Sequence, residues 1–171
     1  RHRRGRADRT VTEAVPPLEG RPEPRRRRGR ILRIIGVTLL ALLAVGVIGF
    51  LWFAQPQPLL PEATAALAST DLATYDGSND LITYTPTAGS PTTGVILYPG
   101  GKVPPAAYAP PARAIAEAGY LSVVVSVPFN FAVFDIEAAA PVIDAHPEIE
   151  HWVVGGHSLG GAMAAQFLSG N

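Results

Sequence analysis

Residues 152–161 read W-V-V-G-G-H-S-L-G-G, and this stretch decides the fold of the chain. It opens with apolar, β-branched residues, and residues 162–168, A-M-A-A-Q-F-L, follow it directly. The apolar opening is typical of a buried strand, and the run of small and apolar residues that follows favours a helix. The sequence therefore predicts a strand, a sharp turn and a helix, with Ser158 at the apex of the turn.

This turn fits the G-x-S-x-G pattern of a nucleophile elbow, in which a serine hydroxyl projects above a sheet from a strained turn. Gly156 and Gly160 allow the strand and helix backbones to approach each other closely. The N–H of Leu159 would lie at the helix N-terminus, where it can donate to a developing oxyanion. A plain glycine-rich turn is the alternative. His157 is expected to pack rather than to act as the base, because neighbours on a tight turn point apart.

Charge is divided unevenly along the chain, although the formal net charge is zero. Residues 1–33 hold 12 basic residues, all arginine, and 4 acidic ones, a net of +8. Residues 54–171 hold 2 basic and 10 acidic residues, a net of −8. This asymmetry indicates a basic tail beside an anionic surface and a separate acidic domain. The chain has no cysteine, which excludes disulfides, thiolate zinc sites and a cysteine nucleophile.

The N-terminal third of the chain predicts a membrane anchor. Residues 1–33 are expected to form a disordered cytoplasmic tail. The run from Ile34 to Phe53 has 20 residues without a charge, enough for a helix of about 30 Å, which is one hydrocarbon core. We expect an uncleaved signal-anchor with the rest of the chain outside the cytoplasm, and a cleaved signal peptide is the alternative. We assign the four arginines at 25–28 to setting the membrane topology and contacting lipid headgroups rather than to binding nucleic acid.

The remaining residues predict a linker and then an α/β domain. Residues 54–71 are expected to form the linker, which opens with a proline-rich spacer and can hold a brief helix within 62–70. Strands are predicted over 81–85, 94–98, 121–127 and 151–155, and helices over 104–119 and 136–145, with Asp135 as an N-cap and Gly119 as a C-terminal stop. Strands that alternate with helices predict a parallel sheet whose working edge lies at the carboxyl ends of the strands.

A strand is followed by the P-G-G-K loop at 99–102, a helix, a second strand and the G-G-H-S-L-G-G turn. The order of these elements resembles the α/β-hydrolase superfamily. Residues 72–171 are most similar to its dienelactone-hydrolase-like branch, the α/β-hydrolase fold-5 type, some members of which carry an N-terminal anchor. The resemblance implies a three-layer αβα core in which Ser158 is the acyl nucleophile and the Leu159 N–H is one oxyanion donor. Gly101 or Lys102 would supply the second N–H. A simple turn at 100–101 and a solvated charge at Lys102 are the alternatives.

The chain departs from the superfamily pattern after the elbow. The triad acid and histidine normally follow the nucleophile, but none of the thirteen residues after Ser158 is Asp, Glu or His. His146 and His151 would lie at the end of the sheet opposite the elbow, and Asp135 lies at the correct edge without a histidine. We therefore expect that the domain is cut off after the elbow helix and that the triad acid and histidine lie beyond Asn171.

The leading functional hypothesis is a membrane-anchored serine hydrolase that cleaves carboxylic ester or thioester bonds outside the cytoplasm. The alternative is a non-catalytic, membrane-tethered hydrolase-like domain whose acidic face binds a partner. A nucleic-acid-binding arm is a third hypothesis, which rests on the arginine run alone. The chain has neither a P-loop nor a G-x-G-x-x-G motif, and nothing in it indicates a metal, so no cofactor is expected.

Overall fold

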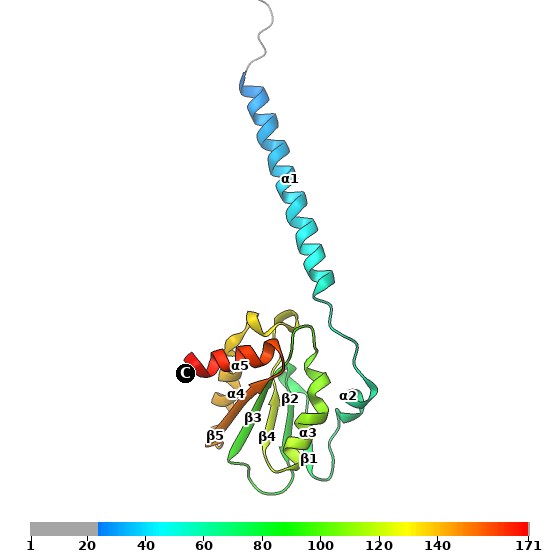
Figure 1. Ribbon diagram of the computed structural model, residues 1–171, viewed down its shortest axis with the longest axis vertical. Helices are drawn as coiled ribbons and strands as arrows, with labels where there is room; N and C mark the ends of the chain where they lie inside the picture. The colour runs from blue at the N-terminus through cyan, green and yellow to red at the C-terminus, as the bar shows by residue number, and fades with distance from the viewer. Residues whose placement is uncertain (1–23, 171) are drawn as a thin grey trace, which may run out of the picture. The chain divides into compact units, whose positions relative to one another are not determined.

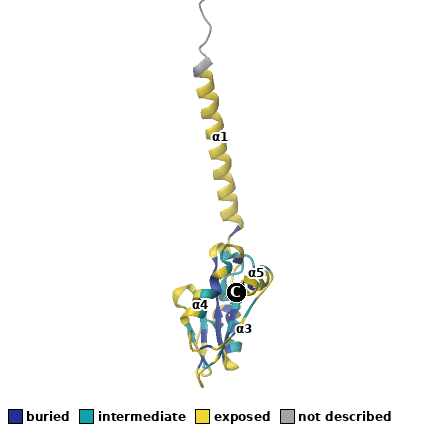
Figure 2. Ribbon diagram, turned by 90° about the vertical axis from the view of Figure 1, so that its left-hand side faces the viewer, coloured by how far each residue is buried: buried dark blue, intermediate teal, exposed yellow. Residues whose placement is uncertain are grey.

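The computed structural model describes residues 24–170 of a chain that divides into two compact units, Arg1–Val47 and Ile48–Asn171. The described part of the first unit belongs to one long helix, α1 (Pro24–Phe53), whose last residues belong to the second unit (Figure 1). From residue 27 to residue 53 every residue of this helix is exposed (Figure 2). The span Arg27–Phe53 is long and apolar enough to cross a membrane, a test that a signal sequence also passes.

The helix α1 begins earlier than the sequence analysis predicted. It starts at Pro24 rather than at Ile34, so residues 24–33 are helical where a disordered tail was expected. Arginine has a high helix propensity, and proline is tolerated in a first helical turn because its missing N–H has no helical partner there. The arginine-rich residues therefore extend the apolar helix. Residues 1–23 of the expected tail lie outside the described residues.

The second unit is built on a five-stranded sheet in the order β1-β2-β4-β3-β5. The strands are β1 (Ala73–Asp76), β2 (Ile82–Pro86), β3 (Thr93–Tyr98), β4 (Leu121–Val124) and β5 (His151–Gly156). The strands β4, β3 and β5 are parallel, which confirms the pattern predicted for them. The strands β1 and β2 are antiparallel to their neighbours, so the whole sheet is mixed (Figure 1).

Helices cover both faces of this sheet and produce the predicted three layers. On one face α2 (Pro61–Ala66) and α3 (Ala109–Glu117) enclose a cluster that includes Val124. On the other face α4 (Ala140–Ala145) and α5 (Leu159–Gly170) enclose a larger cluster that includes Val123. Successive residues of a strand point to opposite faces, so β4 contributes to both cores.

Strand β4 is shorter than predicted, since it ends at Val124 rather than at Val127. Its register explains the difference. Val124 pairs with Ile82, the first residue of β2, on one side and with Leu97, near the end of β3, on the other. Beyond this point β2 offers no further partner, and the last bond to β3 is the one from the Val125 N–H to the Leu97 carbonyl at 3.1 Å.

Prolines divide both predicted helices. The first becomes a 3₁₀ turn, Pro105–Tyr108, followed by α3, and the second becomes a 3₁₀ turn, Ile136–Ala139, followed by α4. A proline lies in the first turn of α3 and of α4, where its missing N–H is tolerated and the helical ladder begins again. Asp135 occupies the N-cap position of the turn Ile136–Ala139, as predicted, but its side chain makes no capping bond there. Gly119 ends α3 with a φ of 99°, as predicted.

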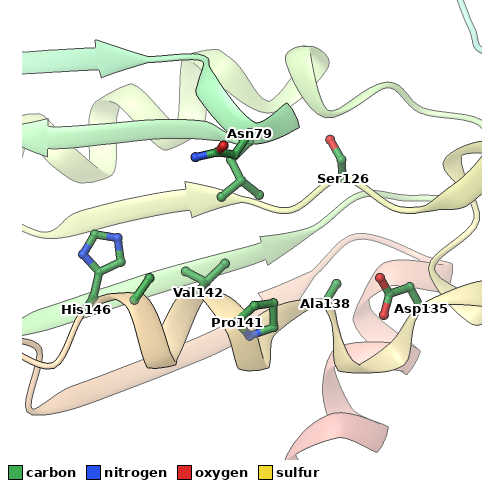
Figure 3. Close-up of a pocket in the computed structure, with 9 residues that line it drawn as sticks. Asn79, Ser126, Asp135, Ala138, Pro141, Val142 and His146 are labelled. Atoms are coloured by element: carbon green, nitrogen blue, oxygen red, sulfur yellow. The ribbon is translucent and has the colours of Figure 1, made fainter.

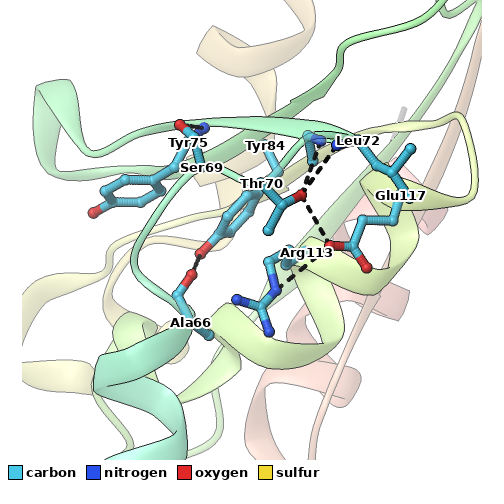
Figure 4. Close-up of polar contacts among 9 residues, drawn as sticks. Ala66, Ser69, Thr70, Leu72, Tyr75, Tyr84, Arg113 and Glu117 are labelled. Atoms are coloured by element: carbon cyan, nitrogen blue, oxygen red, sulfur yellow. Dashed lines mark hydrogen bonds and ion pairs between the residues drawn. The ribbon is translucent and has the colours of Figure 1, made fainter.

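Sequence analysis missed β1 and assigned α2 to a linker. Asp76-Gly77, a turn dipeptide between two apolar-containing runs, was the available signal for the β1–β2 hairpin. The helix α2 packs on α3 and buries Ala66, because alanine side chains allow close helix approach. Tyr84 on β2 donates a hydrogen bond of 2.6 Å to the carbonyl of Ala66 (Figure 4), and burial raises the pKa of Tyr84 to about 12. The folded domain thus includes part of the expected linker.

Tyr98 ties the end of β3 to the chain before α4. Its ring is fully buried, its hydroxyl donates to the Ile136 carbonyl at 2.6 Å, and it accepts the Ala139 N–H at 2.9 Å. Burial raises the pKa of this hydroxyl above its usual value.

Replacing Tyr98 by phenylalanine is expected to destabilise the domain by about 1–3 kcal/mol, because the buried Ala139 N–H and the part-buried Ile136 carbonyl lose their partner. Thermal unfolding followed by circular dichroism measures the effect. Tyr120→Phe is the matched control, because Tyr120 is exposed. Equal midpoints for the two variants would contradict the role given to Tyr98.

Candidate active site

Ser158 lies between β5 and α5 in the conformation that an elbow requires. The strand ends at Gly156, the helix begins at Leu159, and Ser158 has a φ of 52°. This left-handed conformation is uncommon for a residue with a side chain and costs about 1–3 kcal/mol. Ser158 is exposed, so its hydroxyl is available to a molecule that approaches the carboxyl edge of the sheet.

The two glycines of the motif allow the sharp turn, as predicted. A Cβ on Gly156 would lie 2.6 Å from the carbonyl carbon of Gly160. A Cβ on Gly160 would clash with the backbone carbonyl oxygen of Tyr98, at the end of β3. Only glycine fits at either position, because the opposing atoms are backbone and cannot rotate away.

The first predicted oxyanion donor, Leu159, is in a suitable place. It is the first residue of α5, and its N–H has no acceptor within residues 24–170. Unpaired N–H groups at a helix N-terminus attract negative charge. The geometry of Leu159 therefore suits an oxyanion donor.

The structure separates the two candidates for the second donor. The N–H of Lys102 donates to the carbonyl of Asn130 at 2.8 Å and is therefore occupied. The N–H of Gly101 has no acceptor in the described part of the chain, and a Cβ on Gly101 would lie 3.6 Å from the Leu159 side chain. Of the two, Gly101 has the free N–H and lies beside the elbow.

Tyr108 joins the loop after β3 to the elbow, a contact that sequence analysis missed. Its hydroxyl accepts the N–H of Gly100 at 2.9 Å and lies 3.2 Å from Nδ1 of His157. His157 is exposed rather than packed in the core, and its own N–H donates to the carbonyl of Tyr98. Tyr108 lies within the helix predicted over 104–119, and nothing in its local sequence indicated a partner 49 residues away.

The described histidines do not supply a general base to Ser158. His151 is the first residue of β5, at the opposite end of that strand from the elbow, as predicted. His146 follows α4 and contacts Glu148 at 2.8 Å, a contact that lowers the pKa of Glu148. His157 contacts Tyr108. No histidine among residues 24–170 makes a hydrogen bond with Ser158.

A cavity of about 330 Å³ beside α4 holds another serine, aspartate and histidine. Its lining is Asn79, Leu81, Ser126, Asp135, Ala138, Pro141, Val142, Ala145 and His146. Ser126 donates its hydroxyl hydrogen to the carbonyl of Asp80, and Figure 3 shows His146 at the other end of the cavity from Ser126 and Asp135. These three residues therefore do not form a catalytic unit. Within residues 24–170 no cluster of three His, Cys, Asp or Glu could hold a metal ion.

Comparison with known proteins supports the α/β-hydrolase domain that the sequence predicts. Residues 94–171 match a family model described as the alpha/beta hydrolase family, and the matched segment runs from β3 through the elbow helix. The comparisons with curated proteins and with solved structures gave no match. The mixed sheet with its parallel half, the helices on both faces and the glycine-flanked turn agree with the family match. Residues 94–171 are therefore identified as part of an alpha/beta-hydrolase domain.

Proposed function

We propose that this protein is a membrane-anchored serine hydrolase that cleaves carboxylic ester or thioester bonds. Membership of the alpha/beta hydrolase family supports a hydrolase-like function. The observation that carries the proposal is the exposed Ser158, held at a φ of 52° between a strand and a helix N-terminus. Strained residues of this kind cluster at functional sites.

In the proposed reaction Ser158 Oγ attacks the carbonyl carbon of the substrate and gives its proton to a general base. The N–H groups of Leu159 and Gly101 hold the oxyanion of the tetrahedral intermediate. The intermediate collapses to an acyl-enzyme as the alcohol or thiol leaves with the proton from the base. Water then attacks the acyl-enzyme and releases the carboxylic acid. Each oxyanion donor contributes a factor on the order of 10² to 10³ in related chemistry.

The general base has to come from residues outside 24–170, because the described histidines do not reach Ser158. A histidine is needed to take the proton of Oγ, and an acid is needed to orient that histidine. Activity therefore has to be measured on the intact, membrane-bound protein.

We place α1 in the membrane with its N-terminal end in the cytoplasm. The apolar part of the helix is preceded by Arg27, Arg28, Arg30 and Arg33, and it carries no charge from Ile34 to Phe53. Positive charge is concentrated on the cytoplasmic side of membrane spans. The hydrolase domain would then lie outside the cytoplasm.

The test is labelling with a fluorophosphonate probe, which reacts covalently with activated serines. Native membranes are labelled, the protein is captured, its size is read on a gel and the modified peptide is identified by mass spectrometry. Modification at Ser158 supports the proposal. A folded, unlabelled protein would favour the non-catalytic, membrane-tethered binding domain, in which the elbow lacks its base.

The contact of Tyr108 with the loop after β3 provides a further prediction. Tyr108→Phe removes the acceptor of the Gly100 N–H, so the adjacent Gly101 donor is held less firmly. A hydrogen bond of this kind contributes about 0.5–1.5 kcal/mol, and kcat for a chromogenic ester is expected to fall by up to about tenfold with KM little changed. Tyr75→Phe, on the distant strand β1, is the control. A change in KM alone would argue that Tyr108 acts on substrate binding instead.

A further inference from the structure

An uncharged, aromatic segment follows β4 at the carboxyl edge of the sheet. Residues 128–134 read P-F-N-F-A-V-F and form two 3₁₀ turns, Pro128–Asn130 and Ala132–Phe134. The exposed fractions of Phe129, Val133 and Phe134 are 51%, 49% and 54%. We call Phe129, Phe131, Val133 and Phe134 the aromatic lip. Exposed apolar patches of this kind mark surfaces that bind something.

The lip packs against the last residues of α1, which belong to the same compact unit. The ring of Phe50 lies 5.5 Å from that of Phe129 and 6.2 Å from that of Phe134, in edge-to-face geometry. The ring of Phe53 stacks on Phe131 at 6.2 Å. The lip and the end of the apolar helix thus form one continuous aromatic surface.

The backbone of the lip is held in an unfavourable conformation. Phe129 and Asn130 have φ values of 55° and 57°, and a positive φ is rare for a bulky residue. The Phe129 side chain lies on the surface, where about half of it remains exposed. An unfavourable backbone that displays an apolar side chain indicates a function for that side chain.

The lip also adjoins the candidate oxyanion loop. The carbonyl of Asn130 accepts the N–H of Lys102 at 2.8 Å, and a Cβ on Gly101 would lie 3.4 Å from the ring of Phe131. The Lys102 ammonium lies 4.6 Å from the centre of the Phe53 ring. Aromatic rings next to a lysine are typical of the interfacial zone of a membrane, where the rings enter the headgroup layer and the ammonium stays in water.

We propose that the aromatic lip contacts the lipid bilayer at the level of its headgroups, beside the point where α1 leaves the membrane. This inference rests on the membrane anchor of the proposed function. The lipid occupant is favoured because the lip carries no charge, is continuous with the apolar helix and is flanked by Lys102. A bilayer contact here brings the candidate site to the lipid surface, where amphiphilic esters accumulate.

Single-cysteine labelling tests the proposal cleanly, because the chain has no cysteine of its own. Val133→Cys places a nitrobenzoxadiazole fluorophore on the lip. Ser90→Cys places it on the exposed loop before β3, and Leu43→Cys places it in α1. The intact protein is reconstituted in phosphatidylcholine vesicles with or without doxyl-labelled phosphatidylcholine, and iodide serves as the aqueous quencher.

The label at residue 133 is expected to show blue-shifted emission, quenching by the doxyl lipid and protection from iodide. The label at residue 90 is expected to emit without a blue shift, to escape quenching by the doxyl lipid and to be quenched by iodide. The label at residue 43 should be quenched by the doxyl lipid. Phe129→Asp combined with Phe134→Asp is expected to abolish lipid quenching at residue 133 but not at residue 43. Circular dichroism is used to check that this double variant is folded.

Three results would overturn the proposal, and they separate it from the anchor. If the label at residue 43 is quenched by lipid while the label at residue 133 behaves like that at residue 90, the lip does not contact lipid, but the membrane anchor of the proposed function stands. If neither label is quenched by lipid, both the lipid contact of the lip and the membrane anchor are wrong. Protection of residue 133 from both quenchers would show that protein, rather than lipid, covers the lip.

Discussion

Ser158→Ala is expected to abolish fluorophosphonate labelling and to lower ester turnover by a factor on the order of 10⁶, the size of effect that follows loss of a serine nucleophile. Alanine keeps the Cβ and lacks only the hydroxyl, so the elbow between β5 and α5 should persist. The hydrolysis of a chromogenic ester by the intact protein measures turnover, and the extent of fluorophosphonate labelling measures how much of residue 158 reacts.

Ser169→Ala is the matched control for this experiment. Ser169 lies near the other end of α5, is exposed, and donates its hydroxyl hydrogen to the carbonyl of Gln166. Its replacement is expected to leave both labelling and turnover unchanged. If Ser158→Ala retained most of the activity, the nucleophile would lie elsewhere, and the φ of 52° at Ser158 would need a structural explanation.

The strand–turn–helix elbow around Ser158 could be predicted because its determinants are local. The strand pattern, the two glycines, the serine and the helix all lie within residues 151–170, and the turn geometry follows from their order. The parallel half of the sheet was predictable for a related reason, since each crossover contains a helix. The antiparallel strand β1 was missed because four residues carry too weak a periodic signal.

The sequence could not separate the two candidates for a second oxyanion donor, because the difference between their N–H groups depends on a contact between distant segments. Lys102 is excluded by a hydrogen bond to Asn130, and Asn130 reaches it only because the lip folds back over the loop after β3. The Tyr108–His157 contact also joins residues that only the folded sheet brings together. Local patterns identify the type of loop, but tertiary contacts determine which N–H stays free.

Gly156→Ala is expected to destabilise the domain by at least about 1–3 kcal/mol, the range found when groups are forced into close-packed sites. The added methyl would lie 2.6 Å from the carbonyl carbon of Gly160 and 2.7 Å from the carbonyl oxygen of Tyr98. Neither neighbour is a side chain that can rotate away, so β5, β3 or α5 must shift. A shift of α5 also moves Ser158 and the Leu159 N–H, so labelling should slow even at temperatures where the variant remains folded.

The adjacent Gly155 offers a stringent control, because a Cβ there would meet no atom within 4 Å. Gly155→Ala should leave the unfolding midpoint and the labelling rate close to those of the unmodified protein. The pair isolates the close approach of strand and helix from any general effect of adding a methyl group to β5. If the two variants unfolded at the same temperature and labelled at the same rate, the tight packing of Gly156 on Gly160 would not be what sets the geometry of the elbow.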